Sequence, residues 1–524
     1  PLSSSDGLLD ELERALGAAR RADIEERARG MEAAVLPTFR TLPKLPGDRL
    51  SPGGARYMLH RLFASRRNWY VRGFDNGGDA WDAASPSTAF QVHSGGQLEG
   101  IFESRLASEG LSLNETLALA ATLESLAHED DMARLDAAYR VANVDPDAAP
   151  MQDDRAEDVI DAYMVMYLTR TAAGEATPER IMPKTAPEAD DWFGYWPATR
   201  EWIRETRQAV VAKEGDRGGT ADGDGTSRAA TARVVDELTQ RYGWYSDQEC
   251  LDLKRRLAVL EEGGTGRVPL HSFYGAALHG SYEFSETRGY LGQIGALDES
   301  DAASPKVIIP NYVLAPSNCM AGTRFYSVCC INECEGVLGQ IERHVGAPEA
   351  LPGAIVEVVE RIPSSTVAAP RSLHAALIER LEGVAAQHGG RVPLHGRLFA
   401  QWLHNAYPRE CPYPHVSGTA KLLTSREYQL GHSEPHVLGT PALQAEVDSH
   451  SEEQEMIAEV PWSAEEELFV HMPARQGSSD KKSSLLRCFV MLVAAISMVL
   501  SALRSSSTGK TAMGWGSKKE KCMV

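Results

Sequence analysis

GRVPLH, residues 266–271, is repeated letter for letter at residues 390–395 of the 524-residue chain. Each copy follows an amphipathic helical stretch and a glycine-rich turn, and each precedes a second stretch with helical periodicity. Both of these second stretches carry a Leu-His pair and then a tyrosine. An internal duplication of a helix-loop-helix explains this shared order better than a chance recurrence of six residues.

The repeated unit resembles an EF-hand, in which loop position six is glycine and position eight is an apolar residue that pairs with a neighbouring loop. Gly266 and Val268 match these positions in the first copy, and Gly390 and Val392 match them in the second. We therefore expect the glycines to form the turn and the valines to pair or pack. Residues Val307–Ile309 are expected to supply the short strand that pairs with the first copy.

The oxygen ligands of a calcium loop are almost entirely missing. Loop position one is Glu261 in the first copy and Ala385 in the second, and position twelve is Ser272 or Gly396. Calcium needs six to eight oxygens, usually with a bidentate carboxylate at position twelve. The resemblance therefore implies degenerate units that do not bind calcium and that serve packing or partner binding. A helix-loop-helix of another origin is the alternative interpretation.

Helical periodicity dominates the chain, and no stretch alternates with period two for long enough to indicate a sheet. The sequence predicts a mainly α fold with helix-loop-helix units in two helical regions. A capping box, Ser112 followed by Glu115, marks one helix start. The expected segments are an amphipathic leader helix at 1–39, an N-terminal helical domain at 40–172, a linker region with a Gly- and Asp-rich spacer at 173–231, a helical domain with the duplicated unit at 232–419, and a largely disordered acidic tether at 420–483.

The C-terminal region contains an apolar stretch without a charge, CFVMLVAAISMVLSAL at residues 488–503. Its length and composition predict a transmembrane helix at 484–504, followed by a basic tail at 505–524. Such a helix near the chain's end predicts a single-pass membrane protein with a C-terminal anchor. By analogy with tail-anchored proteins, the bulk of the chain is expected in the cytosol. A buried core helix or a surface amphipathic helix is the alternative.

Composition excludes several classes of function. The formal charge of −20 argues against nucleic-acid binding, which needs clustered basic residues to displace counterions. Eight cysteines in 524 residues are too few for a small disulfide-rich secreted scaffold. The chain shows no phosphate-binding loop, nucleophile elbow or kinase signature, so no catalytic residue is predicted.

Four cysteines are clustered in the sequence: Cys319, Cys329, Cys330 and Cys334. Three or four thiolates could bind zinc or respond to oxidants, although the spacing lacks a C-x-x-C pair. Buried core cysteines are the simpler interpretation. The leading hypothesis is a membrane-tethered helical scaffold or protein-interaction module without catalytic activity or cofactor, in contact with the bilayer and an unidentified protein partner. The alternative is a metal- or thiol-dependent protein that uses these four cysteines.

Longer stretches are similar to a family of algal and protist proteins of the dinoflagellate type. The similar text includes LPKLPGDRLSPGGARYMLHRLF, GTGRVPLHSFY, NYVLAPSNCMAGTRFYSVCCINECE and VPLHGRLFAQWLHNAYPRECPYPH. Together the similar stretches extend over about residues 40–415. No established function is attached to that family, so the resemblance implies neither an activity nor catalytic residues.

Overall fold

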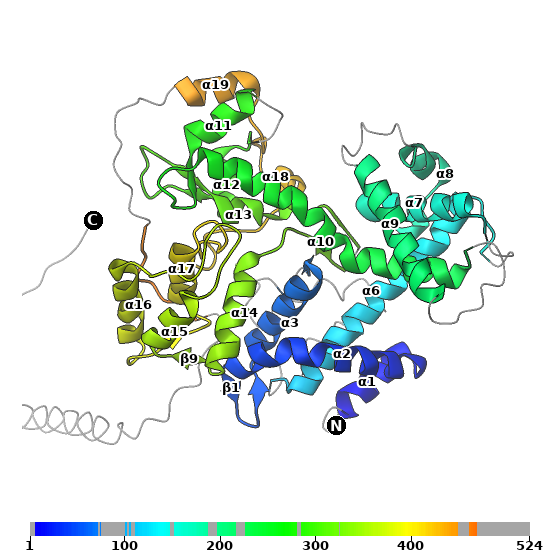
Figure 1. The fold of residues 1–524 in the computed structure, drawn as a ribbon, viewed down its shortest axis with the longest axis horizontal. Helices are drawn as coiled ribbons and strands as arrows, with labels where there is room; N and C mark the ends of the chain where they lie inside the picture. Colours follow the sequence, from blue (N-terminus) through cyan, green and yellow to red (C-terminus); the bar gives the residue numbers. More distant parts are fainter. Residues whose placement is uncertain are drawn as a thin grey trace, which may run out of the picture. The chain divides into compact units, whose positions relative to one another are not determined.

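The computed structural model confirms a mainly helical fold (Figure 1). Its sheets are small, with strands of two or three residues that pair antiparallel in the described part of the chain. The described residues are 6–71, 74, 100–101, 104–105, 110–146, 151–186, 196–215, 226–279, 284–323, 325–448 and 461–468.

Long helices of the N-terminal half build a first hydrophobic core. The elements are α1 (Asp6–Leu16), α2 (Ala19–Thr41), β1 (Lys44–Leu45), β2 (Arg49–Leu50), α3 (Pro52–Arg67), β3 (Trp69–Tyr70), α6 (Leu113–Val141), α7 (Asp153–Leu168), α8 (Pro178–Ile181) and α9 (Trp196–Gly215). Helix α6 begins with the predicted capping box: the Ser112 hydroxyl accepts the Glu115 amide N–H, and the Glu115 carboxylate accepts the Ser112 N–H. Two amides that a helix start leaves unpaired are thereby satisfied. Helix α2 packs along α6.

Residues of the expected leader and of the expected linker contribute to this core. Leu12 on α1 and Met31 on α2 are fully buried, because the apolar face of the leader packs on the core. In the expected linker, Ile181 and Trp196 are fully buried as well. The Gly- and Asp-rich spacer itself, residues 216–225, lies outside the described residues. Amphipathic periodicity indicates an apolar face, but it does not reveal what that face will contact.

Helix α10 (Arg228–Leu260) runs through the domain boundary expected near residue 232. Its first half contributes Val234 and Leu238 to the first core, and its second half contributes Cys250 and Leu257 to a second core. One continuous helix therefore joins the two regions that the sequence separates into domains (Figure 1).

The first helix-loop-helix pair forms the second core. It consists of α10, β4 (Arg267–Pro269) and α11 (Leu270–His279), together with α12 (Arg288–Gln293), β5 (Leu297–Asp298), β6 (Lys306–Ile308) and α13 (Ile309–Val313). Strands β4 and β6 pair antiparallel with Val268 opposite Val307. The predicted pairing of the first hexapeptide with this strand is therefore confirmed. Both valines are fully buried, and such cross-strand pairs are the stabilising unit of a small sheet.

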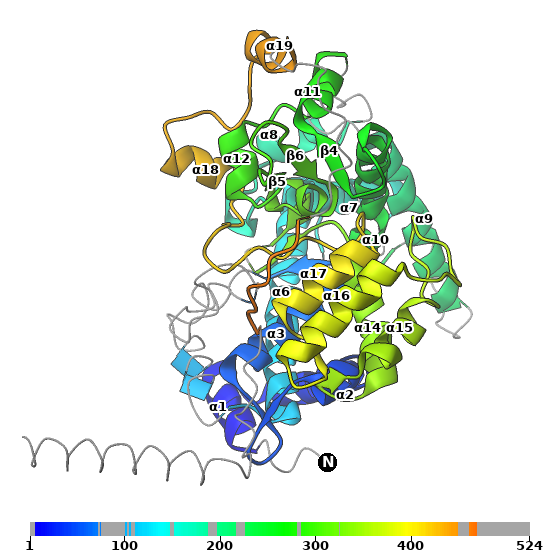
Figure 2. The same ribbon diagram turned by 90° about the vertical axis from the view of Figure 1, so that its left-hand side faces the viewer.

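The second helix-loop-helix pair forms a third core with a similar order of elements, but without a counterpart of β5 in the described residues. It consists of α14 (Glu333–Val345), β9 (Glu349–Ala350) and α15 (Pro352–Val359), followed by α16 (Ala375–Gln387), β10 (Val392–Pro393) and α17 (Arg397–Ala406). Val392 lies opposite Ala350 in an antiparallel pair. Figure 2 shows the four helices of this pair grouped together. The valine of each hexapeptide copy thus sits in a buried strand that pairs with the companion loop.

The segment expected to be a disordered tether is more ordered than its acidic composition predicts. Its described parts form α18 (Ser425–Gly431), α19 (Thr440–Asp448) and an extended stretch at 461–468. Helix α19 packs on α11 through the buried Leu443 (Figures 1 and 2), and Tyr428 on α18 is buried too. The prediction of disorder is wrong for these residues, because a few apolar side chains between the acidic ones attach the segment to the core.

No helix within the described ranges is long and apolar enough to span a membrane. The predicted transmembrane helix at 484–504 and the basic tail at 505–524 lie outside those ranges. The chain divides into one compact unit, Pro1–His471, and a second, Met472–Val524.

The glycines of the two hexapeptides share a backbone conformation but not an environment. Gly266 and Gly390 have φ values of +72° and +90°, a region that glycine adopts without steric cost. A Cβ atom at position 266 would lie 2.0 Å from the carbonyl oxygen of Pro408, whereas nothing lies within 4 Å of a Cβ at position 390. The first loop therefore packs tightly against the chain that leaves α17.

Substitution of each glycine by alanine separates the effect of the left-handed backbone conformation from the effect of the close contact with Pro408. The left-handed conformation alone costs alanine about 1–2 kcal/mol, which is the loss expected for Gly390→Ala. For Gly266→Ala we expect a total loss of about 4 kcal/mol or more, or failure to fold, because the added methyl overlaps backbone that cannot rotate away. Urea unfolding followed by circular dichroism compares the two variants. Equal losses would contradict the contact between the first loop and Pro408.

Candidate functional site

The four clustered cysteines do not converge on one centre. Within the described residues they belong to three disulfides: Cys319–Cys329, Cys250–Cys330 and Cys334–Cys411. A disulfide sulfur is not the thiolate that binds zinc or reacts with oxidants. The described residues also contain no group of three or more His, Cys, Asp or Glu placed to hold a metal ion. A zinc site at these cysteines would first require reduction of the disulfides.

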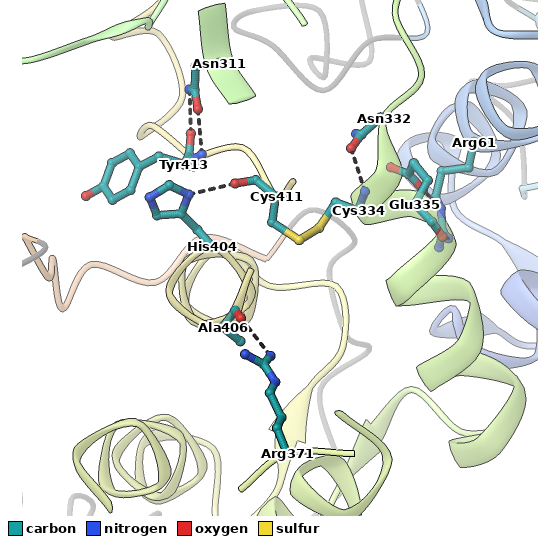
Figure 3. The surroundings of a disulfide bond; sticks show 10 residues. All are labelled: Arg61, Asn311, Asn332, Cys334, Glu335, Arg371, His404, Ala406, Cys411 and Tyr413. Atoms are coloured by element: carbon teal, nitrogen blue, oxygen red, sulfur yellow. Dashed lines mark hydrogen bonds and ion pairs between the residues drawn. A yellow bond between two sulfur atoms is a disulfide. The ribbon is translucent and has the colours of Figure 1, made fainter. Parts of the chain in front are cut away.

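Residues 319–334, which we call the crossing segment, contact all three cores of the described structure. The segment contains β7 (Ala321–Gly322) and β8 (Ser327–Val328), and β8 pairs with β3. Val328 belongs to the first core, Cys330 to the second, and Cys334 packs on the third. Figure 3 shows the bond from Cys334, at the start of α14, to Cys411, beyond the end of α17.

Two of these disulfides close long loops. Cys250–Cys330 and Cys334–Cys411 link residues 80 and 77 positions apart. By restricting the unfolded chain, a loop of this length contributes on the order of 4 kcal/mol to the free energy of unfolding. The disulfides therefore hold the second and third cores against the crossing segment.

Glu261, at loop position one of the first copy, is already paired within the protein. Its Oε1 accepts the backbone N–H of Gly266 at 2.5 Å, and its Oε2 accepts Nε of Arg409 at 2.5 Å. The side chain is only 1% exposed. A guanidinium group from the far end of the second helix-loop-helix pair thus neutralises the carboxylate that a calcium loop would turn to its ion.

The arginine of the first hexapeptide joins the two copies through a buried histidine. Arg267 is buried; its Nε donates to Asp298 at 2.6 Å and its Nη1 donates to Nε2 of His404 at 2.9 Å. The Nδ1–H of His404 donates to the carbonyl of Cys411 at 2.7 Å (Figure 3). Burial, reinforced by the positive charge of Arg267, lowers the pKa of His404 to about 3. The imidazole is therefore neutral, with one nitrogen donating and the other accepting.

The histidine of the second hexapeptide connects this copy to the N-terminal helices. His395 is buried between the hydroxyls of Tyr57 on α3 and Thr41 on α2, each 3.2 Å from a ring nitrogen. Burial lowers its pKa to about 4, although the nearby Glu342 carboxylate opposes the shift. Each copy of GRVPLH thus uses a buried polar side chain to contact another part of the chain.

Residues 461–468, which we call the docked segment, lie against the loop and the first turn of α17. The backbone N–H of Arg397 donates to the carbonyl of Glu467 at 2.8 Å, and Gly396 forms an antiparallel bridge with Leu468. The segment therefore pairs through its main chain, as an added β-strand does.

A carboxylate of the docked segment occupies the N-terminus of α17. Glu466 accepts the backbone N–H of Leu398 at 3.1 Å and lies 2.8 Å from Nε2 of His388. A helix N-terminus presents unpaired amides and partial positive charge, which favour an anion there. Hydrogen bonding and charge thus both favour a carboxylate at this position.

The side chain of Arg397 donates further hydrogen bonds to the docked segment. It is completely buried, and its Nε donates to the carbonyl of Glu465 at 2.8 Å while Nη2 donates to the Ser463 hydroxyl at 2.9 Å. Trp462 packs on the third core, with the Arg380 guanidinium 5.5 Å from its ring. Sequence reasoning did not identify Arg397 or this segment as a site. The available signal was an isolated tryptophan in a strongly acidic stretch.

The buried His404 makes stability depend on pH. Its imidazole takes up a proton near pH 6.5 when unfolded but only near pH 3 when folded. The unfolded state therefore binds more protons between these values, and the free energy of unfolding falls as the pH is lowered through this window. His404→Gln, which keeps a donor and an acceptor, should make that slope shallower by up to about 1.4 kcal/mol per pH unit.

The chain offers a matched control for this change. His279 follows leucine in α11 as His404 does in α17, but it is exposed. Urea unfolding between pH 4.5 and 6 should give a smaller slope for His404→Gln than for His279→Gln. Identical slopes would show that His404 is not held neutral by its surroundings.

Comparisons with known proteins do not supply a function for this arrangement. No protein-family model, no curated protein and no solved structure matches the chain.

Proposed function

We propose that the chain is a non-catalytic interaction module whose second helix-loop-helix pair binds an acidic peptide strand. The observation that carries this proposal is the docked segment itself, which fills the loop and the N-terminus of α17. In this proposal, residues 461–468 are the internal occupant, and a protein partner presents a similar strand that competes with it.

The contacts combine general and specific recognition. Main-chain pairing at Gly396 and Arg397 accepts any extended strand. The amide of Leu398 and the ring of His388 select a carboxylate. Trp462, four residues earlier, adds apolar contact with the third core. The expected partner sequence is therefore an aromatic residue followed, four positions later, by glutamate.

In this proposal the peptide is bound without calcium. This is what the resemblance to degenerate EF-hand units implies. Both carboxylate oxygens of Glu261 are hydrogen-bonded within the protein. Calorimetric titration of the full chain with millimolar calcium should give no saturable heat. A calcium affinity of millimolar or tighter would contradict this part of the proposal.

The proposed location of the folded body differs from the cytosolic one expected from the sequence. Disulfides persist in oxidising compartments and are rare in the cytosol, and the described residues contain three. We therefore propose that residues 1–471 face an oxidising compartment. The proposal of a C-terminal anchor at 484–504 is retained.

Release of the docked segment tests the proposed peptide site. Glu466→Gln combined with Trp462→Ala removes the charged and apolar contacts of the segment while leaving Arg397 and α17 intact. A fluorescent peptide of sequence PWSAEEEL should then bind the full-chain variant in trans. It should bind the wild type at least about 100-fold more weakly, because the internal copy competes at a millimolar effective concentration. Fluorescence anisotropy measures both affinities.

Glu465 provides the matched control, since its side chain is exposed while its carbonyl accepts a hydrogen bond from Arg397. A Glu465→Gln peptide should bind the released variant as tightly as the parent peptide, whereas a Glu466→Gln peptide should bind more weakly. Failure of the parent peptide to bind, or equal loss with both glutamine peptides, would contradict the proposal.

A further inference from the structure

A cavity of about 330 Å³ lies where the crossing segment meets α3, α17 and the loop after α17. Each of the three disulfides contributes one cysteine to its wall: Cys329, Cys330 and Cys334. A sulfur bonded in a disulfide carries no charge and no proton, so these residues add apolar surface beside aliphatic side chains such as Leu338 and Leu403. The volume is at the lower end of the usual range for small-molecule sites.

The polar side-chain atoms of Asn68 and Trp69 do not face this cavity, although both residues line it. The amide of Asn68 and the indole nitrogen of Trp69 are fully buried. A Cβ atom on Gly243 of α10 would lie 2.7 Å from Nδ2 of Asn68, so the amide is directed against α10. The Trp69 ring is stacked on Phe63 and on Tyr326, with centroid separations of 5.9 and 3.7 Å. Neither side chain therefore offers a hydrogen bond to a ligand.

Other polar side chains of the wall are hydrogen-bonded within the protein. The Asn311 amide donates to the carbonyls of Gly295 and Tyr413, at 2.9 and 3.0 Å, and accepts the N–H of Tyr413 at 2.7 Å (Figure 3). Nε2 of His415 lies 2.7 Å from the same Gly295 carbonyl. These bonds fix the loop after α17, and a ligand would have to break them to gain its own. The wall therefore favours a molecule that needs no hydrogen bond.

The charges of the wall do not favour an ion. Among the described lining residues, the one carboxylate is that of Glu335, and none is lysine or arginine. Glu335 is ion-paired with Arg61. Burial lowers the pKa of His415, so its ring is neutral at pH 7. A charged ligand would lose its water here without gaining an opposite charge, which is costly.

We propose that this cavity binds an uncharged, apolar small molecule. Removal of apolar surface from water supplies the affinity, and the polar groups of the wall that are already paired keep their partners when the ligand enters. This site is separate from the proposed peptide site at the N-terminus of α17, and either can fail without the other.

A matched pair of fluorescent probes tests the class of ligand. N-phenyl-1-naphthylamine is uncharged, and 8-anilino-1-naphthalenesulfonate has the same rings with an added sulfonate. Fluorescence titration of the full, disulfide-bonded chain should show saturable binding of the neutral probe at one site. The sulfonate should bind at least about 10-fold more weakly, because the wall offers this anion no positive charge.

Three variants locate the site. Ala400→Phe fills the cavity from α17, and Ala420→Trp fills it from the loop after α17; each should abolish saturable binding of the neutral probe. Ala386→Phe places a ring at an exposed position of α16, outside the cavity wall, and should leave the affinity unchanged. Circular dichroism verifies folding, and the two filled positions lie on different elements, so one remains informative if the other variant does not fold.

Three results would overturn the proposal. Absence of saturable binding by the wild type would show that the cavity does not hold an apolar molecule. Binding of the sulfonate as tightly as the neutral probe would show that charge is not excluded. Binding that survives in a folded variant with a filled cavity would place the probe elsewhere on the chain.

Discussion

The crossing segment, residues 319–334, is the constraint on which the arrangement of the described chain depends. It supplies a strand to the first core, a disulfide to the second through Cys330 and a disulfide to the third through Cys334. Because these links are only a few residues apart, the three cores must meet around one short stretch of chain. The cavity lined by its cysteines lies at that meeting point.

The two copies of GRVPLH keep one structural role and differ in the contacts that they make. In both copies the glycine turns the chain and the valine pairs in a short sheet. The first copy contacts the end of the second pair, through Gly266 against Pro408 and Arg267 on His404. The second copy contacts the N-terminal helices through His395. Loops that would face an ion in a calcium-binding protein therefore face the same chain here.

Local features of the fold could be predicted from the sequence, and distant contacts could not. Periodicity indicates the helices, because it depends on neighbouring residues. The resemblance to an EF-hand predicted the pairing of Val268 with the strand at Val307, because loop position eight pairs with the neighbouring loop in that unit. The leader is helical as expected, and the supposed tether is partly ordered. The sequence could not show what either segment packs against, since an amphipathic or acidic segment does not reveal which surface covers its apolar side chains. The cysteine cluster was noticed without two of its partners: Cys250 and Cys411 lie 80 and 77 residues from the cysteines that they bond. The docked segment was missed for the same reason, because its recognition by Arg397 exists only in the folded chain.

Disulfide mapping is the sharpest test of how the three cores are joined, because the arrangement of the cores and the walls of the cavity both depend on these bonds. Protein isolated with immediate alkylation of free thiols would be digested without reduction, and the linked peptides identified by mass spectrometry. We expect the pairs Cys250–Cys330, Cys319–Cys329 and Cys334–Cys411. Alkylated, free cysteines at these positions, or a different pairing among them, would contradict it.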